Sequence, residues 1–149
     1  MAGNAIPQFT KNGNIGSALL IAANAASDGS GIIGTDIFVA FLADALNGSL
    51  VGLVRFLPVA LAANSTTATV ARIFASSKAV GVTSPADTFL IGEVVLPIAG
   101  ASNPVTPASL VGFAIDMRLP AGWTILVTTD ATPAAGTTWR ATVLRSGDY

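Results

Sequence analysis

The chain has 149 residues, enough for one ordinary domain with a core of its own. Apolar residues make up 52% of it and charged residues only 10%, and seven basic side chains nearly balance eight acidic ones. A nucleic-acid interface needs a concentrated basic face, whereas these basic residues are scattered singly along the sequence. Composition therefore argues against nucleic acid as a partner. Histidine and cysteine are absent, which excludes disulfides, thiolate metal sites and the commonest general base.

The mean hydropathy of +0.68 is high enough to require a check for membrane spans. The most apolar stretch, residues 50–63, is interrupted by Arg55 and Pro58. A second long stretch, residues 94–115, carries no charge but contains three prolines. A spanning helix needs about 18 or more consecutive apolar residues, and neither stretch provides them. We therefore expect no membrane partner.

Apolar segments of strand length alternate with turn residues along the chain, a pattern typical of a β-sandwich or barrel. Turn signals include Asp28-Gly29-Ser30-Gly31, Asn47-Gly48 and Pro120-Ala121-Gly122. The sequence predicts an all-β, single-domain, two-sheet antiparallel sandwich that resembles a jelly roll. Residues 1–14 are expected to form an extended N-terminal arm and residues 15–149 the sandwich. The predicted strands, about eight in number, are residues 19–26, 37–43, 49–61, 68–75, 89–96, 111–119, 123–129 and 137–144.

Residues 36–46 fit two kinds of structure. Asp36 could cap a helix and Gly48 could end it, with Phe38 and Leu42 on one helical face. We favour a strand, because β-branched and aromatic residues dominate the start and the hairpin signal Asn47-Gly48 follows. In the next segment, Pro58 indicates a sheet edge or a bulge.

Strict alternation of apolar and other residues makes segment 111–119 the clearest strand. It places Phe113, Ile115 and Met117 on the core side. Trp123 and Trp139 fall on segments expected to be neighbouring strands, where they could stack on a sugar or a base. We favour a core position for both, because each shares one strand face with other apolar residues.

The motifs that could carry chemistry are weak. Segment 29–34 matches the dinucleotide-binding spacing of glycines, but a strand rather than a helix is expected to follow, so it is interpreted as a glycine-rich turn. The acids are few and spread out, which disfavours paired-carboxylate chemistry and calcium binding. A serine nucleophile would have only Lys11 or Lys78 as a base. We expect no cofactor, no metal, no small-molecule substrate and no enzymatic activity.

Low charge on a chain this apolar leaves little electrostatic repulsion between copies and much apolar surface to cover. These properties favour a protein that assembles with copies of itself or with a larger lattice over one that remains a free monomer. Within the N-terminal arm, the apolar side chains of Ile6, Pro7 and Phe9 are the candidate contacts with a neighbouring subunit.

The order of several short segments resembles that of structural proteins of tailed-bacteriophage particles. The pieces are Asn47-Gly48-Ser49 between two strands, residues 69–74, residues 92–97, Leu119-Pro120-Ala121-Gly122-Trp123, residues 125–129, Trp139, and Ser146-Gly147-Asp148-Tyr149. Together they span most of residues 35–149. No functional residues transfer, because the shared positions are turns and core.

The resemblance implies a capsid decoration (cement) protein that binds the outer capsid surface and stabilises contacts between major capsid subunits. The partners it implies are the chain itself, as a homotrimer, and the major capsid protein. The location it implies is the virion capsid surface, after synthesis in the host cytoplasm. Two alternatives stay open: a tail, neck or baseplate component of the particle, and a carbohydrate-binding or adhesin module.

Overall fold

The structure, a computed structural model, describes residues 12–60, 66–99, 110–144 and 146–148. These residues form strands, turns and irregular segments and contain no helix, so none of them forms a helix that could cross a membrane. The strands are β1 (Asn12–Gly13), β2 (Gly16–Leu20), β3 (Gly31–Ile32), β4 (Phe38–Leu42), β5 (Ser49–Ala60), β6 (Thr69–Ser76), β7 (Val82–Thr83), β8 (Thr88–Leu96), β9 (Val111–Leu119), β10 (Thr124–Thr129), β11 (Thr137–Leu144) and β12 (Gly147–Asp148).

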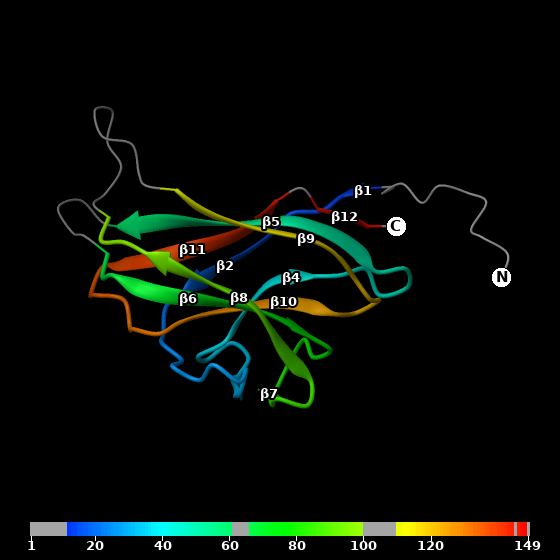
Figure 1. Ribbon diagram of the computed structural model, residues 1–149, viewed down its shortest axis with the longest axis horizontal. Coiled ribbons are helices and arrows are strands. Elements are labelled where there is room, and N and C mark those ends of the chain that lie inside the picture. The colour runs from blue at the N-terminus through cyan, green and yellow to red at the C-terminus, as the bar shows by residue number, and fades with distance from the viewer. Residues whose placement is uncertain (1–11, 61–65, 100–109, 145, 149) are drawn as a thin grey trace, which may run out of the picture.

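The eight longer strands make a sandwich of two antiparallel sheets, seen as upper and middle layers in Figure 1. In chain order they pair first with last and then inward: β2 with β11, β4 with β10, β5 with β9, and β6 with β8. This nested pairing is an antiparallel ribbon rolled up on itself, which is the jelly-roll topology. The predicted all-β, jelly-roll-like sandwich of about eight strands is confirmed.

The first sheet runs β9-β5-β11-β2, and the short strands β12 and β1 continue its β11 and β2 rows. Asn14 and Ile15 on one row and Ser146 on the other lie outside the strands. At the same level the β5–β9 register shifts between Val51 and Leu53, and Asp116 adopts a φ of 47°. The irregularity therefore crosses all four rows of the sheet, as β-bulges do where a sheet bends.

The main core lies between the two sheets. From the first sheet, alternate residues of β5 and β11 point inward, and the second sheet supplies the facing side chains. Its largest fully buried members are Trp139, Phe56, Leu20, Ile73, Leu96, Leu119 and Ile125. Because both inner faces are apolar, their burial is the main source of stability for the sandwich.

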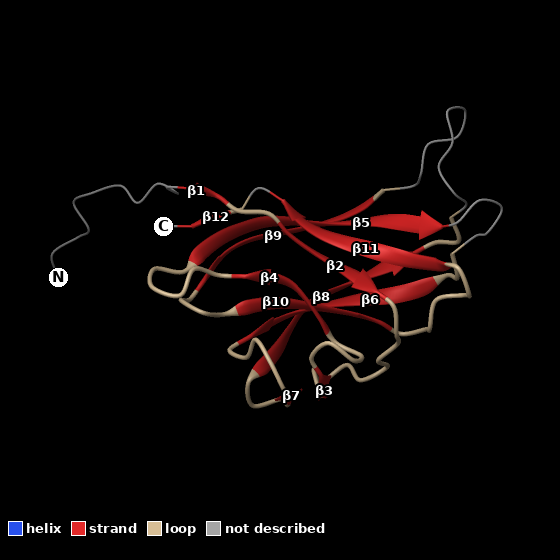
Figure 2. Ribbon diagram, turned by 180° about the vertical axis from the view of Figure 1, so that it is seen from behind, coloured by secondary structure: helices blue, strands red, loops and turns tan. Residues whose placement is uncertain are grey.

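A third layer covers the outer face of the second sheet. The chain between β2 and β4, together with the β3–β7 pair, lies below this sheet in Figures 1 and 2. Ile37, Phe74 and Leu126 are buried there and form a small second core. Strand β10 is consequently buried on both faces, and all six of its residues are buried.

One edge of the sandwich is closed by close contact between backbones. A Cβ atom at Gly16 of β2 would lie only 2.0 Å from the carbonyl oxygen of Ala40 in β4. Glycine is therefore required where these two edge strands, one from each sheet, meet.

The structure corrects three predictions. The first strand ends at Leu20 rather than residue 26, because Asn24 forms a turn: its backbone N–H donates to Thr129 O at 2.8 Å and its side chain to Ser30 O at 2.9 Å. Asn47-Gly48 does not make a hairpin, because β4 and β5 belong to different sheets. The segments that carry Trp123 and Trp139 are not neighbours, because β10 and β11 also belong to different sheets.

The turn at residues 44–48 shows why the hairpin signal misleads. The Asp44 carboxylate accepts hydrogen bonds from the backbone N–H groups of Leu46 and Asn47, at 3.0 and 2.8 Å. Gly48 has a φ of 77°, and a Cβ there would lie 2.3 Å from Leu119 O. Gly48 thus meets the same conformational need as in a hairpin, but the turn carries the chain from one sheet to the other.

Two further expectations are resolved. Residues 38–42 form a strand, β4, and Asp36 caps a turn rather than a helix by accepting a hydrogen bond from Ile32 N–H at 2.7 Å. Pro58 lies beyond Phe56, the last β5 residue paired with β9. Among the described residues none pairs with β5 on that side of Pro58, and a strand edge is where proline is tolerated.

Replacing Gly16 with alanine tests the closed edge. The added methyl would force β2 and β4 apart, and overpacking of this kind typically costs about 1–3 kcal/mol in the free energy of unfolding. Gly13→Ala is the matched control on the same edge, because a Cβ at Gly13 would have no other atom within 4 Å. Urea denaturation should show a clear loss for G16A and little change for G13A. Equal losses would contradict the close approach.

Candidate functional site

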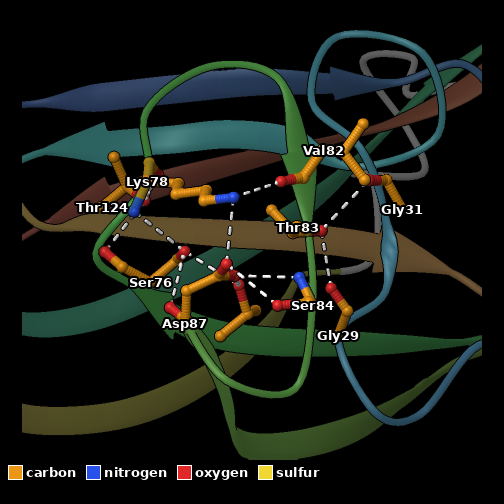
Figure 3. Close-up of polar contacts among 10 residues, drawn as sticks. Gly29, Gly31, Ser76, Lys78, Val82, Thr83, Ser84, Asp87 and Thr124 are labelled. Atoms are coloured by element: carbon orange, nitrogen blue, oxygen red, sulfur yellow. Dashed lines mark hydrogen bonds and ion pairs between the residues drawn. The ribbon is translucent and has the colours of Figure 1, made fainter.

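The densest polar cluster surrounds Asp87, in the loop before β8 (Figure 3). Its carboxylate accepts hydrogen bonds from Ser84 N–H at 2.9 Å, the Ser84 hydroxyl at 3.0 Å and the Thr88 hydroxyl at 2.9 Å. The Lys78 ammonium lies 3.1 Å from the same carboxylate and donates to Val82 O at 2.8 Å. These contacts join both ends of the segment that contains β7.

The Asp87 carboxyl is held in its charged form. The backbone hydrogen bond from Ser84, supported by those from Lys78, Thr88 and the Ser84 side chain, lowers the pKa of Asp87 well below its usual range. Each donor fixes an oxygen and leaves the carboxylate a poor proton acceptor. The arrangement therefore suits a structural anchor rather than a general base.

Lys78 is equally unsuited to activate a serine. Its Nζ atom contacts Val82 O and the Asp87 carboxylate rather than a serine hydroxyl. The nearby Ser76 hydroxyl is 2.9 Å from the Thr88 hydroxyl, donates to Asp87 O at 3.0 Å and accepts from Lys78 N–H at 3.1 Å. The two residues share a network that holds the loop, without the hydroxyl-to-amine contact of a Ser-Lys dyad.

The glycine motif at residues 29–34 belongs to the same region. Gly31 and Ile32 form strand β3, which pairs with Val82 and Thr83, and the Thr83 hydroxyl donates to Gly29 O at 2.7 Å. Gly29 and Gly34 have positive φ values, as glycines in tight turns do. With a strand inside the motif, no helix N-terminus faces a pyrophosphate, which agrees with its interpretation as a turn.

A second charged cluster centres on Arg72 in β6. The guanidinium donates to Glu93 at 2.7 Å and to Asp130 at 3.1 Å, and it also reaches the carbonyl oxygen of Ala25 at 3.3 Å. Only 12% of the Arg72 side chain is exposed. Burial acts to lower the pKa of Arg72, but the two carboxylates outweigh it and raise the pKa. Arg72 thus attaches the third layer to the second sheet.

A third cluster joins the two ends of the described chain. The Asp148 carboxylate accepts hydrogen bonds from the Asn14 amide at 3.2 Å and from the Ser49 hydroxyl. Ser49 also accepts from Asp44 N–H at 2.9 Å, and the Ser146 hydroxyl donates to Asn14 O. The first and last strands therefore meet at one end of the sandwich, where Figure 2 shows both termini.

The two tryptophans have different environments. Trp139 is only 1% exposed and lies in the main core, where a sugar cannot reach it. Trp123 is partly buried against the same core and stacks on Phe89, with ring centroids 6.0 Å apart and an interplanar angle of 11°. Phe89 is 49% exposed, so this pair is the accessible aromatic surface of the two tryptophan sites.

The remaining residues singled out from the sequence are accounted for as follows. Phe113, Ile115 and Met117 are partly buried and pack against the main core, because β9 is an edge strand. Ile6, Pro7 and Phe9 lie outside the described residues. Across the described ranges, no group of three or more acidic side chains is placed to hold a metal ion.

Sequence analysis did not identify the Asp87 and Arg72 clusters as networks. Ser84 and Asp87 stand three residues apart, a spacing that favours a side-chain-capped turn and that could have been noticed. For Arg72 there is no such local signal, because its partners are 21 and 58 residues away along the chain. Only the register of β6 with β8 brings Arg72 opposite Glu93.

Large apolar side chains are also exposed on the described surface. Ile15, Ile21 and Leu46 are exposed near the first sheet and its loops, as are Val80 and Val82 near the third layer. They occur on more than one layer, and charged residues make up only 10% of the chain. The surface is thus suited to contact with other proteins.

Comparison with known proteins gives limited results. No protein-family model matches the chain, and no curated protein matches it. Among solved structures, a chain of the capsid of Ralstonia phage GP4 aligns with 97% of this chain and 89% of its own length. That alignment has 15% sequence identity and a TM-score of 0.47.

The acid sensitivity of the Asp87 cluster can be tested with Asp87→Asn. Because the pKa of Asp87 is lower in the folded state than in the unfolded state, its carboxylate stabilises the protein above the unfolded pKa of about 4. The D87N variant should therefore have a lower urea midpoint than the wild type at pH 7. This difference should narrow steadily below about pH 4, because the carboxyl of the unfolded wild type takes up a proton before that of the folded protein does.

Asp116→Asn is the matched control, because Asp116 is exposed and asparagine tolerates its positive φ. The D116N midpoint should follow that of the wild type at pH 7. A D87N deficit that persisted unchanged at pH 2 would contradict the role of the carboxylate charge.

Proposed function

We propose that this chain is a structural protein of a tailed-phage particle, specifically a decoration protein that binds the outer capsid surface. The observation that carries the proposal is an exposed, apolar and weakly charged surface on a rigid sandwich. Such a surface is suited to permanent contact with other proteins and would favour aggregation in a free monomer. The sequence resemblance described above is the reason for proposing a tailed-phage particle.

The polar clusters support a structural role. The Asp87, Arg72 and Asp148 networks each hydrogen-bond their charged groups within the chain and connect separate segments of it. A decoration protein needs such rigidity, because it holds neighbouring shell subunits in a fixed relation. It needs no catalytic group, and many weak contacts repeated over a lattice add up through multivalency.

The proposed assembly is a homotrimer attached to the major capsid protein. In this proposal, Ile6, Pro7 and Phe9 of the N-terminal arm pack on a neighbouring subunit. Strand β1 begins at Asn12 and pairs with β12, so the arm leaves from the end of the sandwich where the first and last strands meet. A neighbour bound at that end would contact the arms without disturbing the core.

One observation favours a second candidate, a carbohydrate-binding module. The Trp123–Phe89 stack presents an aromatic surface of the kind on which sugar rings pack. Adding oligosaccharides to the protein should then quench or shift tryptophan fluorescence, and Phe89→Ala should weaken the response. Absence of any response across a broad glycan panel would remove this candidate.

The decoration hypothesis predicts a discrete oligomer that binds capsids. Light scattering after size exclusion should give the mass of a trimer, and the protein should co-sediment with undecorated capsids of the phage that encodes it. Replacing Ile6 and Phe9 together with serine should weaken oligomerisation without changing the melting temperature. The matched control is Gln8→Ala with Thr10→Ala in the same segment, which should behave like the wild type. A monomer that is indifferent to capsids would overturn the proposal.

A further inference from the structure

The outer face of the first sheet is left uncovered by the described residues. On β2, β11 and β5, the side chains of Leu19, Leu53, Arg55, Leu57 and Arg140 occupy the positions that alternate with the buried core residues. We call these five residues the arginine face. The second sheet has its outer face covered by the third layer, whereas Figure 1 shows no described element above the first.

The two arginines on this face lie close to each other. Arg55 is opposite Thr142 and Arg140 is opposite Leu57, so the two are diagonal neighbours on adjacent strands. Diagonal neighbours in a sheet are about 7–8 Å apart at their Cα atoms, within reach of each other's long side chains. Their like charges repel each other. Arg140 lies between Leu57 and Leu19 on the neighbouring strands, and Leu53 and Leu57 flank Arg55 along β5, so the face is both apolar and cationic.

No acidic side chain in the described part of the chain neutralises this charge. Within the described ranges, the guanidinium groups of Arg55 and Arg140 make no ion pair. The segments outside the described ranges contain no Asp or Glu at all. Asp148 is paired with Ser49, six residues along β5 from Arg55, which corresponds to about 20 Å of extended strand. A protein that covered this face would have to supply carboxylates to these two arginines, because burying an unpaired charge is costly.

Seven of the chain's eight acids already bind groups within their own subunit, and the eighth, Asp116, is exposed on the edge strand β9 of the same sheet. Glu93 and Asp130 bind Arg72, and Asp87 binds Lys78. The carboxylates of the turns accept backbone N–H groups close to them in sequence. In a two-fold dimer formed through this face, the arginines of one subunit would lie opposite those of the other. This repulsion of like charges would weaken the dimer.

We infer that the arginine face docks on a protein surface of the capsid shell that presents carboxylates among apolar side chains. The inference rests on the proposed decoration function and assigns the surface through which the chain binds the shell. Arginine suits this contact because its planar fork binds a carboxylate through two parallel hydrogen bonds. The flanking leucines exclude water from those bonds. Duplex DNA fits poorly, because two cations among leucines cannot follow a line of phosphates.

The test uses Arg55→Gln with Arg140→Gln, measured by co-sedimentation with undecorated capsids of the encoding phage. The double variant should bind at least about tenfold more weakly, since charge pairs across an interface contribute to affinity. Binding of the wild type should weaken between about 0.05 and 0.5 M NaCl, and the variant should lose most of this salt dependence. The melting temperature of R55Q/R140Q should not fall, because the change removes a repulsion.

The matched control is Thr132→Glu with Ala135→Glu, two exposed positions in the loop between β10 and β11. It changes the net charge by the same two units and should bind capsids like the wild type. If the wild type binds capsids and R55Q/R140Q binds equally well, the arginine face is wrong while the decoration function stands. If the wild type does not bind capsids, both are wrong.

Two further measurements separate other occupants. Sedimentation velocity of the purified chain should give the same oligomer for the wild type and R55Q/R140Q. Loss of the oligomer in the variant would show that a second copy occupies the face and would overturn the inference. A gel shift with duplex DNA should show no binding at about 0.15 M NaCl. A shift that the double variant abolished would assign the face to nucleic acid instead.

Discussion

Burial of β10 on both faces is the constraint on which the rest of this structure depends. On one side Ile125 and Val127 belong to the main core, and on the other Leu126 belongs to the small core under the third layer. A strand buried twice needs a sheet on one face and a cover on the other. The segment between β2 and β4 supplies that cover, and the Asp87 and Arg72 clusters fasten it in place. The layers on either side of the second sheet are thus both needed to bury the apolar strand β10.

The fold class could be predicted because its signal is local. Alternation in residues 111–119 and turn residues between apolar segments mark strands wherever they later pair. The pairing itself has no such signal. Asn47-Gly48 suggests a hairpin because its glycine needs a positive φ, a need that a turn between two sheets satisfies equally well. Whether a segment forms a strand depends on neighbouring residues, whereas the sheet that it joins depends on distant partners, which for β2 lie more than a hundred positions away.

The polar clusters were harder to predict for the same reason. Arg72 meets Glu93 and Asp130 only after two sheet registers have been set. The end of the first strand was misplaced because Ile21 and its neighbours are apolar enough to continue it. Asn24 turns the chain away, and its partner Thr129 lies at the far end of β10. Apolar composition thus predicts neither the direction of the chain at this point nor burial, because Ile21 is exposed and the polar Asn24 is buried.

Pairing of the first strand with the last has a consequence for synthesis. Asn14 and Asp148 are 134 residues apart in the chain, yet they are hydrogen-bonded. Strand β11 lies between β5 and β2 in the first sheet and is among the last segments to be synthesised. Strands β2 and β5 are therefore made long before the strand with which both of them pair. Folding dominated by such distant pairings is slow and leaves strand edges exposed meanwhile. The yield of folded protein is therefore expected to be higher with slow expression at low temperature. Under those conditions each new chain has time to pair its first and last strands before it associates with another chain.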